Sequence, residues 1–337
     1  MDISGIVPDR ILQLGHAFWG AKALLSAVEL EVFTVLGKEP LGLDALRTRV
    51  GIAERGARDF FDALVSLGML ERDSTGRYAN TPEAALYLDR ETSTYLGDAL
   101  ELLNARQFGP WASLTEALRT GRPQSGARGD GNYLAYYADP SVLENVVKGM
   151  TGSTMQVAKA IAKKFPWCEY NSVIDVGTAQ GCLPVQIAQA HSHMTGGGFD
   201  LRPVKPLFDT YVREWGLSSR LRFYPGDFFQ EPLPSADVLV VGRVLHNWDL
   251  GTKRMLLRKA YEALPRGGAL IVYERLIDDE RRVNALGLLA SLNMLVMTAG
   301  GFDFSGADCI GWMQEVGFRD MRAEPLTPDQ SMVVAFR

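Results

Sequence analysis

The hydrophobic positions in the amino-terminal part of the chain follow a helical period. From Ile11 to Leu36 apolar residues recur at steps of three and four, and Gly37 and Pro40 end the run. Beyond it, the pattern predicts a helix over 43–50, a helix over 54–67 and a small hairpin that turns at 73–76. Three helices followed by a hairpin are typical of a winged helix.

The rest of the chain combines two longer helical segments with short apolar runs. Helices are predicted over 94–120 and 140–165, and the apolar runs lie at 172–176, 198–201, 221–224, 238–242 and 269–273, with a last strand at 331–337. Alternation of apolar runs with helices is typical of βαβ units in a parallel sheet. We therefore expect an α/β protein with a Rossmann-like doubly wound sheet at 167–337 and a helical, winged-helix-like domain at 1–166.

The composition is that of a globular protein without a basic surface. The chain has 337 residues, of which 47% are hydrophobic, and its net charge is −5. Proteins that bind a phosphate backbone carry clusters of Lys and Arg, so nucleic acid is not an expected partner. The three cysteines form neither an even set nor a CxxC pair, which predicts neither a disulfide framework nor a zinc site.

The amino-terminal segment predicts neither export nor membrane insertion. The first ten residues, MDISGIVPDR, contain no basic run before an apolar core. The apolar-rich stretch that follows is interrupted by His16, Lys22, Glu29 and Glu31, which are too many polar groups for a bilayer span. We expect a cytoplasmic protein that has no membrane partner.

His246 is the candidate catalytic residue. It follows the apolar run at 238–242 directly, in the sequence VLVVGRVLHNWD, and so lies just beyond the carboxyl end of a predicted parallel strand, where such sheets bind ligands. Histidine is the side chain best suited to accept a proton near neutral pH. The chain has only four histidines, the others being His16, His191 and His193.

The first two predicted strands of the sheet end in residues suited to a nucleoside. Asp175-Val176-Gly177-Thr178-Ala179-Gln180-Gly181 joins the first strand to a helix, and its glycines allow a sharp turn and a close ligand approach. Asp200 follows the second strand, nineteen residues beyond Gly181, at the approximate spacing of an acid that binds two ribose hydroxyls. A glycine turn that only packs tightly, and a solvated acid, are the alternatives.

The third strand leads into Gly226-Asp227-Phe228-Phe229. Asp227 can accept a hydrogen bond from an adenine amine, while Phe228 offers an apolar face to the ring. The glycine loop lacks the lysine of a P-loop, which disfavours a nucleoside triphosphate. An adenosine without phosphates fits these strand ends better.

These motifs resemble those of the S-adenosylmethionine-dependent small-molecule O-methyltransferases, the dimeric type of plant phenolic and bacterial polyketide pathways. That family has DxGxGxG, DLP, GDFF, LHDW and a late GGxE in this order. Here they read DVGTAQG from Asp175, DLRP from Asp200, GDFF around Asp227, LHNW from Leu245 and GGFD from Gly300. The resemblance covers nearly the whole chain.

The chain departs from the family pattern at several positions. Ala179 replaces a glycine, Arg202 is inserted before a proline, and Gly242 stands where many members have lysine or serine. Cofactor contacts at Gly242 can come only from the backbone. Asp303 is shorter than the family's glutamate.

The resemblance implies a reaction and a set of site residues. The methyl group of S-adenosylmethionine would pass to a hydroxyl of an aromatic or polyketide-like small molecule in secondary metabolism, with His246 as general base and no metal. A homodimer held by the winged-helix domain is implied as well. Catalysis would use His246, Glu274 and Asp303, the cofactor would contact Asp175, Gly177, Gly181, Asp200, Leu201, Asp227, Phe228, Gly242 and Arg243, and the acceptor would contact Met150, Asn293, Met294 and Met297.

Three alternatives remain open from the sequence. The same fold could methylate carbon or nitrogen. A winged-helix regulator that senses a nucleoside is a second possibility, although Arg55 and Arg58 in its third helix are offset by Glu54, Asp59 and Asp62. A dinucleotide oxidoreductase is the third, because an acid at Asp200 also suits NAD.

Overall fold

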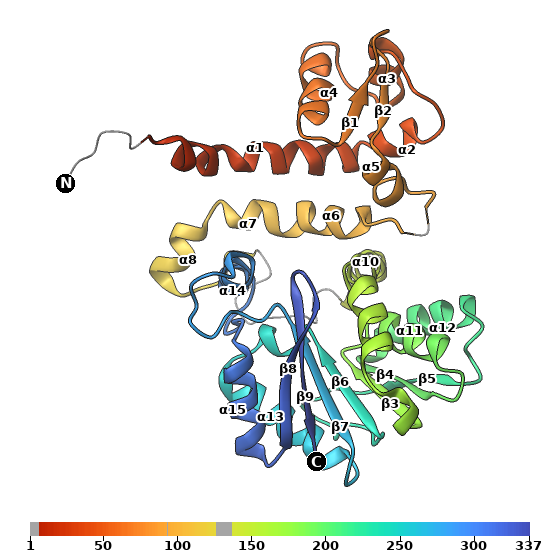
Figure 1. Cartoon of the computed structure of the whole chain (residues 1–337), viewed down its shortest axis with the longest axis vertical. Helices are drawn as coiled ribbons and strands as arrows, with labels where there is room; N and C mark the ends of the chain where they lie inside the picture. Colours follow the sequence, from red (N-terminus) through yellow and green to blue (C-terminus); the bar gives the residue numbers. More distant parts are fainter. Residues whose placement is uncertain (1–6, 93, 126–136) are drawn as a thin grey trace, which may run out of the picture. The chain divides into compact units, whose positions relative to one another are not determined.

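The computed structural model describes residues 7–92, 94–125 and 137–337 (Figure 1). The chain divides into two compact units, Met1–Ala105 and Arg106–Arg337. We expected the boundary at 166/167 instead. The segment before that point belongs with the second unit because Val157 and Ile161 of its long helix are buried in the core of the sheet.

The first unit is mainly helical and contains a two-stranded antiparallel hairpin. Its elements are α1 (Asp9–Glu29), α2 (Val32–Leu36), α3 (Leu43–Arg49), α4 (Ala57–Ser66), β1 (Leu70–Arg72), β2 (Tyr78–Asn80), α5 (Pro82–Tyr87) and α6 (Gly97–Leu103). Phe33, Phe61 and Tyr78 are buried together in its core. The segment predicted as one helix over 11–36 is two, because Glu31 adopts a left-handed conformation with φ 55° between α1 and α2.

One face of α1 exposes large apolar side chains. Ile11, Leu14, Phe18 and Trp19 are 75%, 78%, 57% and 61% exposed, respectively. Hydrophobic side chains that gather on one surface in this way mark an interaction site in most proteins. No helix in the described part of the chain is long and apolar enough to pass through a membrane.

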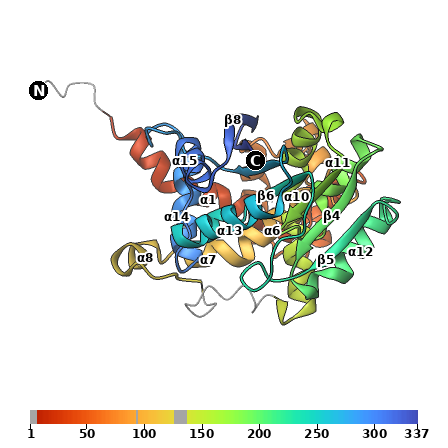
Figure 2. The same cartoon turned by 90° about the horizontal axis from the view of Figure 1, so that it is seen from below.

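The second unit is a seven-stranded sheet with helices on both faces (Figures 1 and 2). Its helical elements are η1 (Asn104–Phe108, which begins in the first unit), α7 (Gly109–Trp111), α8 (Leu114–Thr120), α10 (Pro140–Lys164), η2 (Trp167–Glu169), α11 (Cys182–Ala190), η3 (Arg202–Val204), α12 (Lys205–Glu214), η4 (Leu245–Asn247), α13 (Leu250–Ala263), α14 (Ala285–Met297) and α15 (Gly306–Val316). The strands are β3 (Ser172–Val176), β4 (Thr195–Asp200), β5 (Leu221–Pro225), β6 (Val238–Gly242), β7 (Ala269–Glu274), β8 (Arg319–Thr327) and β9 (Gln330–Phe336).

The strand order places a ligand-binding edge at the ends of β3 and β6. The order is β5-β4-β3-β6-β7-β9-β8, in which the five strands from β5 to β7 are parallel and β9 is antiparallel to β7. The chain moves outward from β3 through β4 and β5 and then returns to the other side of β3 with β6. Doubly wound sheets bind ligands at such a reversal, beyond the carboxyl ends of the strands.

The central strands are apolar throughout because each side chain packs on one of two cores. Ile174 of β3 and Leu239 of β6 face the core with α13 and α15. Val173 and Val238, their sequence neighbours, face the core with α10 and α11. Alternate residues of one short run therefore bury both faces of the sheet, and the loops at its carboxyl edge start from fixed positions.

Candidate active site

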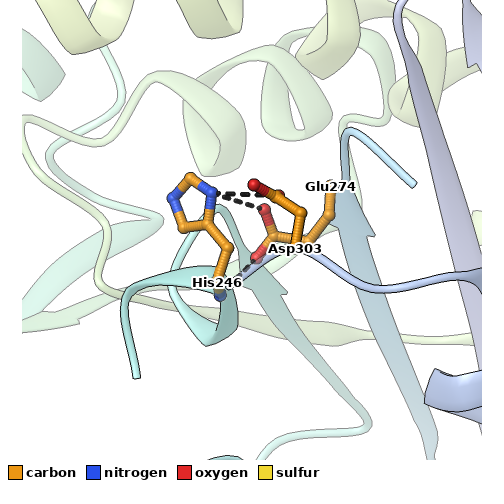
Figure 3. A group of neighbouring side chains, drawn as sticks. All are labelled: His246, Glu274 and Asp303. Atoms are coloured by element: carbon orange, nitrogen blue, oxygen red, sulfur yellow. Dashed lines mark hydrogen bonds and ion pairs between the residues drawn. The ribbon is translucent and has the colours of Figure 1, made fainter. Parts of the chain in front are cut away.

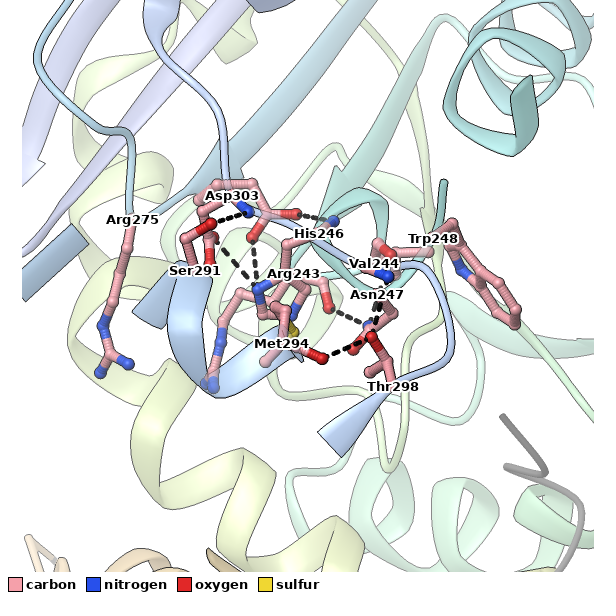
Figure 4. Close-up of polar contacts among 12 residues, drawn as sticks. Arg243, Val244, His246, Asn247, Trp248, Arg275, Ser291, Met294, Thr298 and Asp303 are labelled. Atoms are coloured by element: carbon pink, nitrogen blue, oxygen red, sulfur yellow. Dashed lines mark hydrogen bonds and ion pairs between the residues drawn. The ribbon is translucent and has the colours of Figure 1, made fainter. Parts of the chain in front are cut away.

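The loop after β6 presents His246 at the carboxyl edge of the sheet. Gly242 ends the strand with no side chain, and a Cβ there would overlap the ring of Tyr273 on the neighbouring β7. Arg243 then adopts a left-handed conformation with φ 54°, which turns the chain into η4. The Asn247 side-chain amide donates to the Arg243 carbonyl oxygen at 3.1 Å and closes this turn around His246 (Figure 4).

His246 lies against two buried carboxylates that come from different elements. Its Nδ1 is 3.5 Å from Oε2 of Glu274, at the end of β7, and 3.3 Å from Oδ1 of Asp303, in the loop after α14 (Figure 3). The His246 side chain is 14% exposed, whereas the two acids are almost completely buried. Both carboxylates therefore act on the same ring nitrogen, and the opposite edge of the imidazole is left for other contacts.

A backbone hydrogen bond positions the Glu274 carboxylate, and a hydrogen bond to a side chain fixes the backbone at Asp303. The His246 backbone N–H donates to Glu274 Oε1 at 3.3 Å. The Asp303 backbone N–H donates to Oγ of Ser291 on α14 at 3.1 Å (Figure 4). Within the described part of the chain, Glu274 Oε2 and both Asp303 carboxylate oxygens are buried without a hydrogen-bond donor. A proton on the imidazole Nδ1 would offer a donor to Glu274 Oε2 and Asp303 Oδ1, the two of these oxygens that Nδ1 faces.

Burial changes the protonation of Glu274. Its pKa is raised to about 7, mainly by desolvation and further by the nearby Asp303, while His246 opposes the shift. The acid is therefore poised to change charge near neutral pH. Paired titratable groups with such a shift are a common property of functional sites.

The other histidines have structural contacts. The Nε2 atom of His191 lies 2.8 Å from the Ala162 carbonyl oxygen, and that of His193 lies 3.1 Å from the Trp167 carbonyl oxygen. His16 stacks near Trp19, with ring centroids 4.4 Å apart. None of these three adjoins a carboxylate pair in the described residues.

The loop after β3 turns sharply, as the sequence predicted. Gly177 and Gly181 adopt φ of +77° and +92°, and a Cβ at either would lie 2.6 Å from Val244 or Phe208, respectively. Packing and backbone conformation thus both require glycine here, so the alternative of a tightly packed turn accounts for part of this motif. Asp175 is buried, and desolvation raises its pKa to about 7.

Asp200 joins the loop after β3 to the loop after β4 through two hydrogen bonds. Its Oδ2 accepts from the Ala179 backbone N–H at 2.9 Å, and its Oδ1 accepts from the Leu201 backbone N–H at 2.7 Å. Each oxygen keeps one lone pair for a further donor. Burial raises the pKa of Asp200 to about 6 despite these two bonds.

Asp227 and Phe228 lie beyond the next strand, β5. Asp227 Oδ1 accepts from the Phe229 backbone N–H at 2.9 Å, which stabilises the turn. The Phe228 ring meets the Trp248 ring edge-on at a centroid distance of 5.9 Å. Phe228 is partly buried against the core beside α13, so it joins the β5 loop to the loop that carries His246.

The residues expected to contact the acceptor lie on α10 and α14. Met150 and Met297 are partly buried, and Met294 is buried. Asn293 Oδ1 accepts from Nε1 of Trp111 on α7 at 2.8 Å, so one oxygen of this side chain already has a partner. The structure places Met294 on the helix that also anchors Asp303 (Figure 4), whereas Met150 belongs to the separate helix α10.

The sequence reasoning missed several residues of this region. Ser291 and Trp111 gave no signal, because single polar or aromatic residues in helical segments are common. Lys253 could have been found. It occupies the buried face of α13, where the pattern predicts an apolar side chain, and it is 0% exposed.

Comparisons with known sequences identify the family of the chain. Residues 111–319 match the O-methyltransferase domain, and residues 12–90 match the O-methyltransferase dimerisation domain. The chain is 41% identical over 327 residues to the tetracenomycin polyketide synthesis 8-O-methyl transferase TcmO of Streptomyces glaucescens, covering 97% of this chain and 96% of that protein. It is 38% identical to the N,N-dimethyltransferase OxyT of Streptomyces rimosus over 316 residues, covering 93% and 91%.

Solved structures share the fold. Human N-acetylserotonin methyltransferase, in complex with SAM, superimposes with a TM-score of 0.92 at 26% identity, covering 100% of this chain and 99% of that chain. NcsB1 from neocarzinostatin biosynthesis, in complex with SAM and 2-hydroxy-5-methyl naphthoic acid, gives a TM-score of 0.76 at 25% identity, covering 94% and 95%. The O-methyltransferase domain matches more than half of this chain, and the chain therefore belongs to the S-adenosylmethionine-dependent O-methyltransferases.

Proposed function

We propose that this protein transfers the methyl group of S-adenosylmethionine to a hydroxyl of an aromatic or polyketide-like small molecule in secondary metabolism, with His246 as general base. The observation that carries this proposal is the position of His246 Nδ1, 3.5 Å from Glu274 and 3.3 Å from Asp303. A base flanked on one nitrogen by buried carboxylates is held in one tautomer, and its protonated form is stabilised.

The imidazole performs the proton transfer that a phenol requires. A phenol has an ordinary pKa of about 10, so at neutral pH it is mostly protonated and a poor nucleophile. Nε2 would accept the hydroxyl proton as the oxygen attacks, and the resulting positive charge would be shared with Glu274 and Asp303. The carboxylates act through His246 and need no contact with the acceptor.

The ends of β3 to β6 would hold the cofactor, which supplies an already activated methyl group on its sulfonium. Asp200 fits the ribose, because each carboxylate oxygen has one backbone donor and one free lone pair. Asp227 and Phe228 would contact the adenine. The remaining contacts would come from Asp175, Gly177, Gly181, Leu201, Gly242 and Arg243.

Met150, Met294 and Met297 would line the acceptor pocket, since flexible thioethers pack well against planar rings. Asn293 would contribute its amide group beside Trp111. The naphthoic acid in the NcsB1 complex supports an aromatic acceptor of this kind.

The acceptor atom is tested by product analysis. We expect a panel of polycyclic phenols and aryl amines, incubated with the enzyme and S-adenosylmethionine, to give aryl methyl ethers that mass spectrometry and NMR identify. N-methylation is the second candidate, supported by the 38% identity to OxyT. Methylated amines in the absence of any ether would replace the proposal by that candidate.

His246→Ala and His246→Gln test the base. We expect either variant to lose most turnover, by about 100-fold or more, while S-adenosylhomocysteine binds with unchanged affinity in calorimetry. Full turnover in both variants would remove His246 from the mechanism. Calorimetry with NAD, for which we expect no binding, separates the methyltransferase from the oxidoreductase alternative.

Methyl transfer by this site requires no metal in our proposal. His246, Glu274 and Asp303 nevertheless offer ligand atoms within 4.8 Å of one another, of types that bind divalent cations. We expect activity to survive dialysis against EDTA, because the sulfonium needs no Lewis acid. Loss of turnover that only a divalent cation restores would refute this expectation.

We also propose that the protein is a homodimer joined through its amino-terminal unit. The match of residues 12–90 to the dimerisation domain supports this, and so do the exposed Ile11, Leu14, Phe18 and Trp19 on α1. Burial of these side chains in a partner would remove apolar surface from water. Light scattering of the purified chain measures the mass directly.

A further inference from the structure

Lys253 is a charged residue at a core position of α13. It shares the buried face of this helix with Leu256, Leu257 and Ala260, and it is 0% exposed. Removing an ammonium from water is costly unless other groups compensate for the lost hydration. The packing of α13 alone would be satisfied by an apolar side chain, so the reason for a lysine must lie in what surrounds its Nζ.

The Lys253 ammonium contacts both loops that form the histidine cluster. Nζ donates to the carbonyl oxygen of Trp248, two residues after His246. It also lies 3.3 Å from the centroid of the Phe302 ring and 5.6 Å from that of Phe304. These two aromatic residues flank Asp303 in the sequence, so one cation joins the loop that carries the imidazole to the loop that carries its carboxylate.

The same cation is attracted by three nearby acids, of which Glu274 and Asp303 are buried. Desolvation lowers the Lys253 pKa to about 8, and Glu274, Asp303 and Asp249 act in the opposite direction. Lys253 is therefore charged at neutral pH. No ion pair within 4.0 Å joins Lys253 to either acid among the residues that the structure describes, so the attraction acts through the low-dielectric interior.

We propose that Lys253 is a positioning residue of the active site: its ammonium holds the Asp303 loop against the His246 loop, and its charge allows Glu274 and Asp303 to be ionised together. This inference rests on the proposed function of the cluster as a proton acceptor. It also opposes a metal ion at the same acids, because a second cation would be repelled by the first.

The net charge of the cluster determines in which direction removal of Lys253 shifts the pH at which His246 takes up a proton. Above about pH 7, where Glu274 is mostly ionised, the cluster of charged Lys253, two ionised acids and neutral His246 carries one excess negative charge, and proton uptake by the imidazole neutralises it. Without Lys253 the cluster would carry two excess negative charges in a buried site, and it would take up a proton at higher pH. Asp249 at the start of α13, Arg243 beside Glu274, and the buried Cys309 thiol on α15 also face the cluster, and they are unchanged in the variants below.

Lys253→Met removes the charge at nearly constant side-chain volume. We expect the acid limb of its kcat profile to move to higher pH by about one unit, so that kcat falls by up to about tenfold at pH values below the limb. Arg258→Met is the matched control, because it removes a positive charge from an exposed position of the same helix and should leave the profile unchanged. S-adenosylhomocysteine should bind both variants as it binds the parent protein.

A second measurement reports on the cluster without turnover. Nitrogen-15 NMR of the imidazoles follows His246 directly, since the chain has only four histidines and His246→Gln identifies the resonance. We expect the midpoint of the His246 titration to rise by about one pH unit in Lys253→Met and to stay in place in Arg258→Met. An unshifted midpoint would overturn the inference.

Two further variants distinguish the effect of the Lys253 charge from an effect on packing or folding. Lys253→Gln can still donate to Trp248 but has no charge, so it should show the same upward shift. Lys253→Arg keeps the charge and should restore the parent midpoint. A purely structural role would lower the unfolding temperature and move neither midpoint, which would refute the inference. A shifted midpoint with an unaltered kcat profile would uphold the role of Lys253 and refute His246 as the base.

Discussion

Asp303→Asn is the substitution that tests the carboxylate pair most directly. Asp303 Oδ1 lies 3.3 Å from His246 Nδ1, and the side chain is fully buried. Asparagine has nearly the same shape, so the loop can keep its backbone hydrogen bond to Ser291. The variant therefore removes one negative charge from the cluster with little change in packing.

The size of the effect follows from the distance. Two unit charges 3.3 Å apart attract each other by about 5 kcal/mol at an effective dielectric constant of about 20. Glu274 remains and compensates for part of this loss, so we expect about half of it to appear in the activation free energy, about 2 to 3 kcal/mol. This corresponds to a fall in kcat of about 30- to 150-fold.

The assay is the kcat of methyl transfer as a function of pH, with labelled S-adenosylmethionine and the best acceptor of the panel. Because the protonated imidazole is less stabilised in Asp303→Asn, the acid limb should move to lower pH while the plateau falls. This direction is opposite to that expected for Lys253→Met. Asp320→Asn is the control, since Asp320 is exposed and its positive φ of 51° also suits asparagine.

The result that would refute this reasoning is a normal kcat profile in Asp303→Asn with normal S-adenosylhomocysteine binding. If Glu274→Gln alone then lowered kcat, Glu274 would be the sole partner of His246. If the double variant were also fully active, neither acid would assist the imidazole. We expect instead that the double variant loses less than the product of the two single losses, because both carboxylates act on one nitrogen.

Three further predictions concern stability and assembly. Burial raises the pKa of Asp175 from 3.8 to about 7, so the folded chain binds its proton more tightly than the unfolded chain between these values, and this stabilisation is lost as pH rises through about 7. Urea titrations should show that Asp175→Asn flattens the pH dependence of the unfolding free energy by about 1.4 kcal/mol per pH unit in this window, and an unchanged slope would contradict the shift. Gly242→Ala would drive a methyl group into the Tyr273 ring and should cost about 1 to 3 kcal/mol of stability, whereas Gly311→Ala, in a helix with open space around it, should stabilise by up to about 1 kcal/mol. Leu14→Asp places a charge on the exposed face of α1 and should convert the dimer to folded monomers in light scattering, while an intact dimer would exclude this face from the interface.

The strands that carry the site could be predicted from the sequence because they are buried on both faces. The predicted bounds of β3, at 172–176, and of β6, at 238–242, are those of the structure, since short continuous runs of Val, Ile and Leu are typical of central strands in a parallel sheet. Their parallel arrangement followed from the alternation with helices. The positions of Asp175, Asp200, Asp227 and His246 at one edge of the sheet then followed from the parallel topology.

Elements with weak or mixed patterns were harder to predict. The first half of β4 was missed, because Thr195, Gly196 and Gly197 have low strand propensity and pair only when β3 and β5 lie beside them. The edge strand β8 was missed as well, since most of its side chains are exposed and do not alternate. The segment at 94–120 was expected to be helical throughout, but a π-helical turn at Asn104–Phe108 interrupts it.

By itself the sequence determined which residues could do chemistry and which sheet edge they would share, because hydrophobic periodicity and the alternation of strands with helices can be read along the chain. It did not determine that Glu274 and Asp303, from separate elements, reach the same nitrogen of His246, since side-chain distances across a loop depend on packing. Nor did it show that Lys253 lies beneath the aromatic residues that flank Asp303. Only the tertiary structure decided those contacts, because they join residues from separate elements that packing brings together. Burial then removes the water that would otherwise weaken the interactions between these charges.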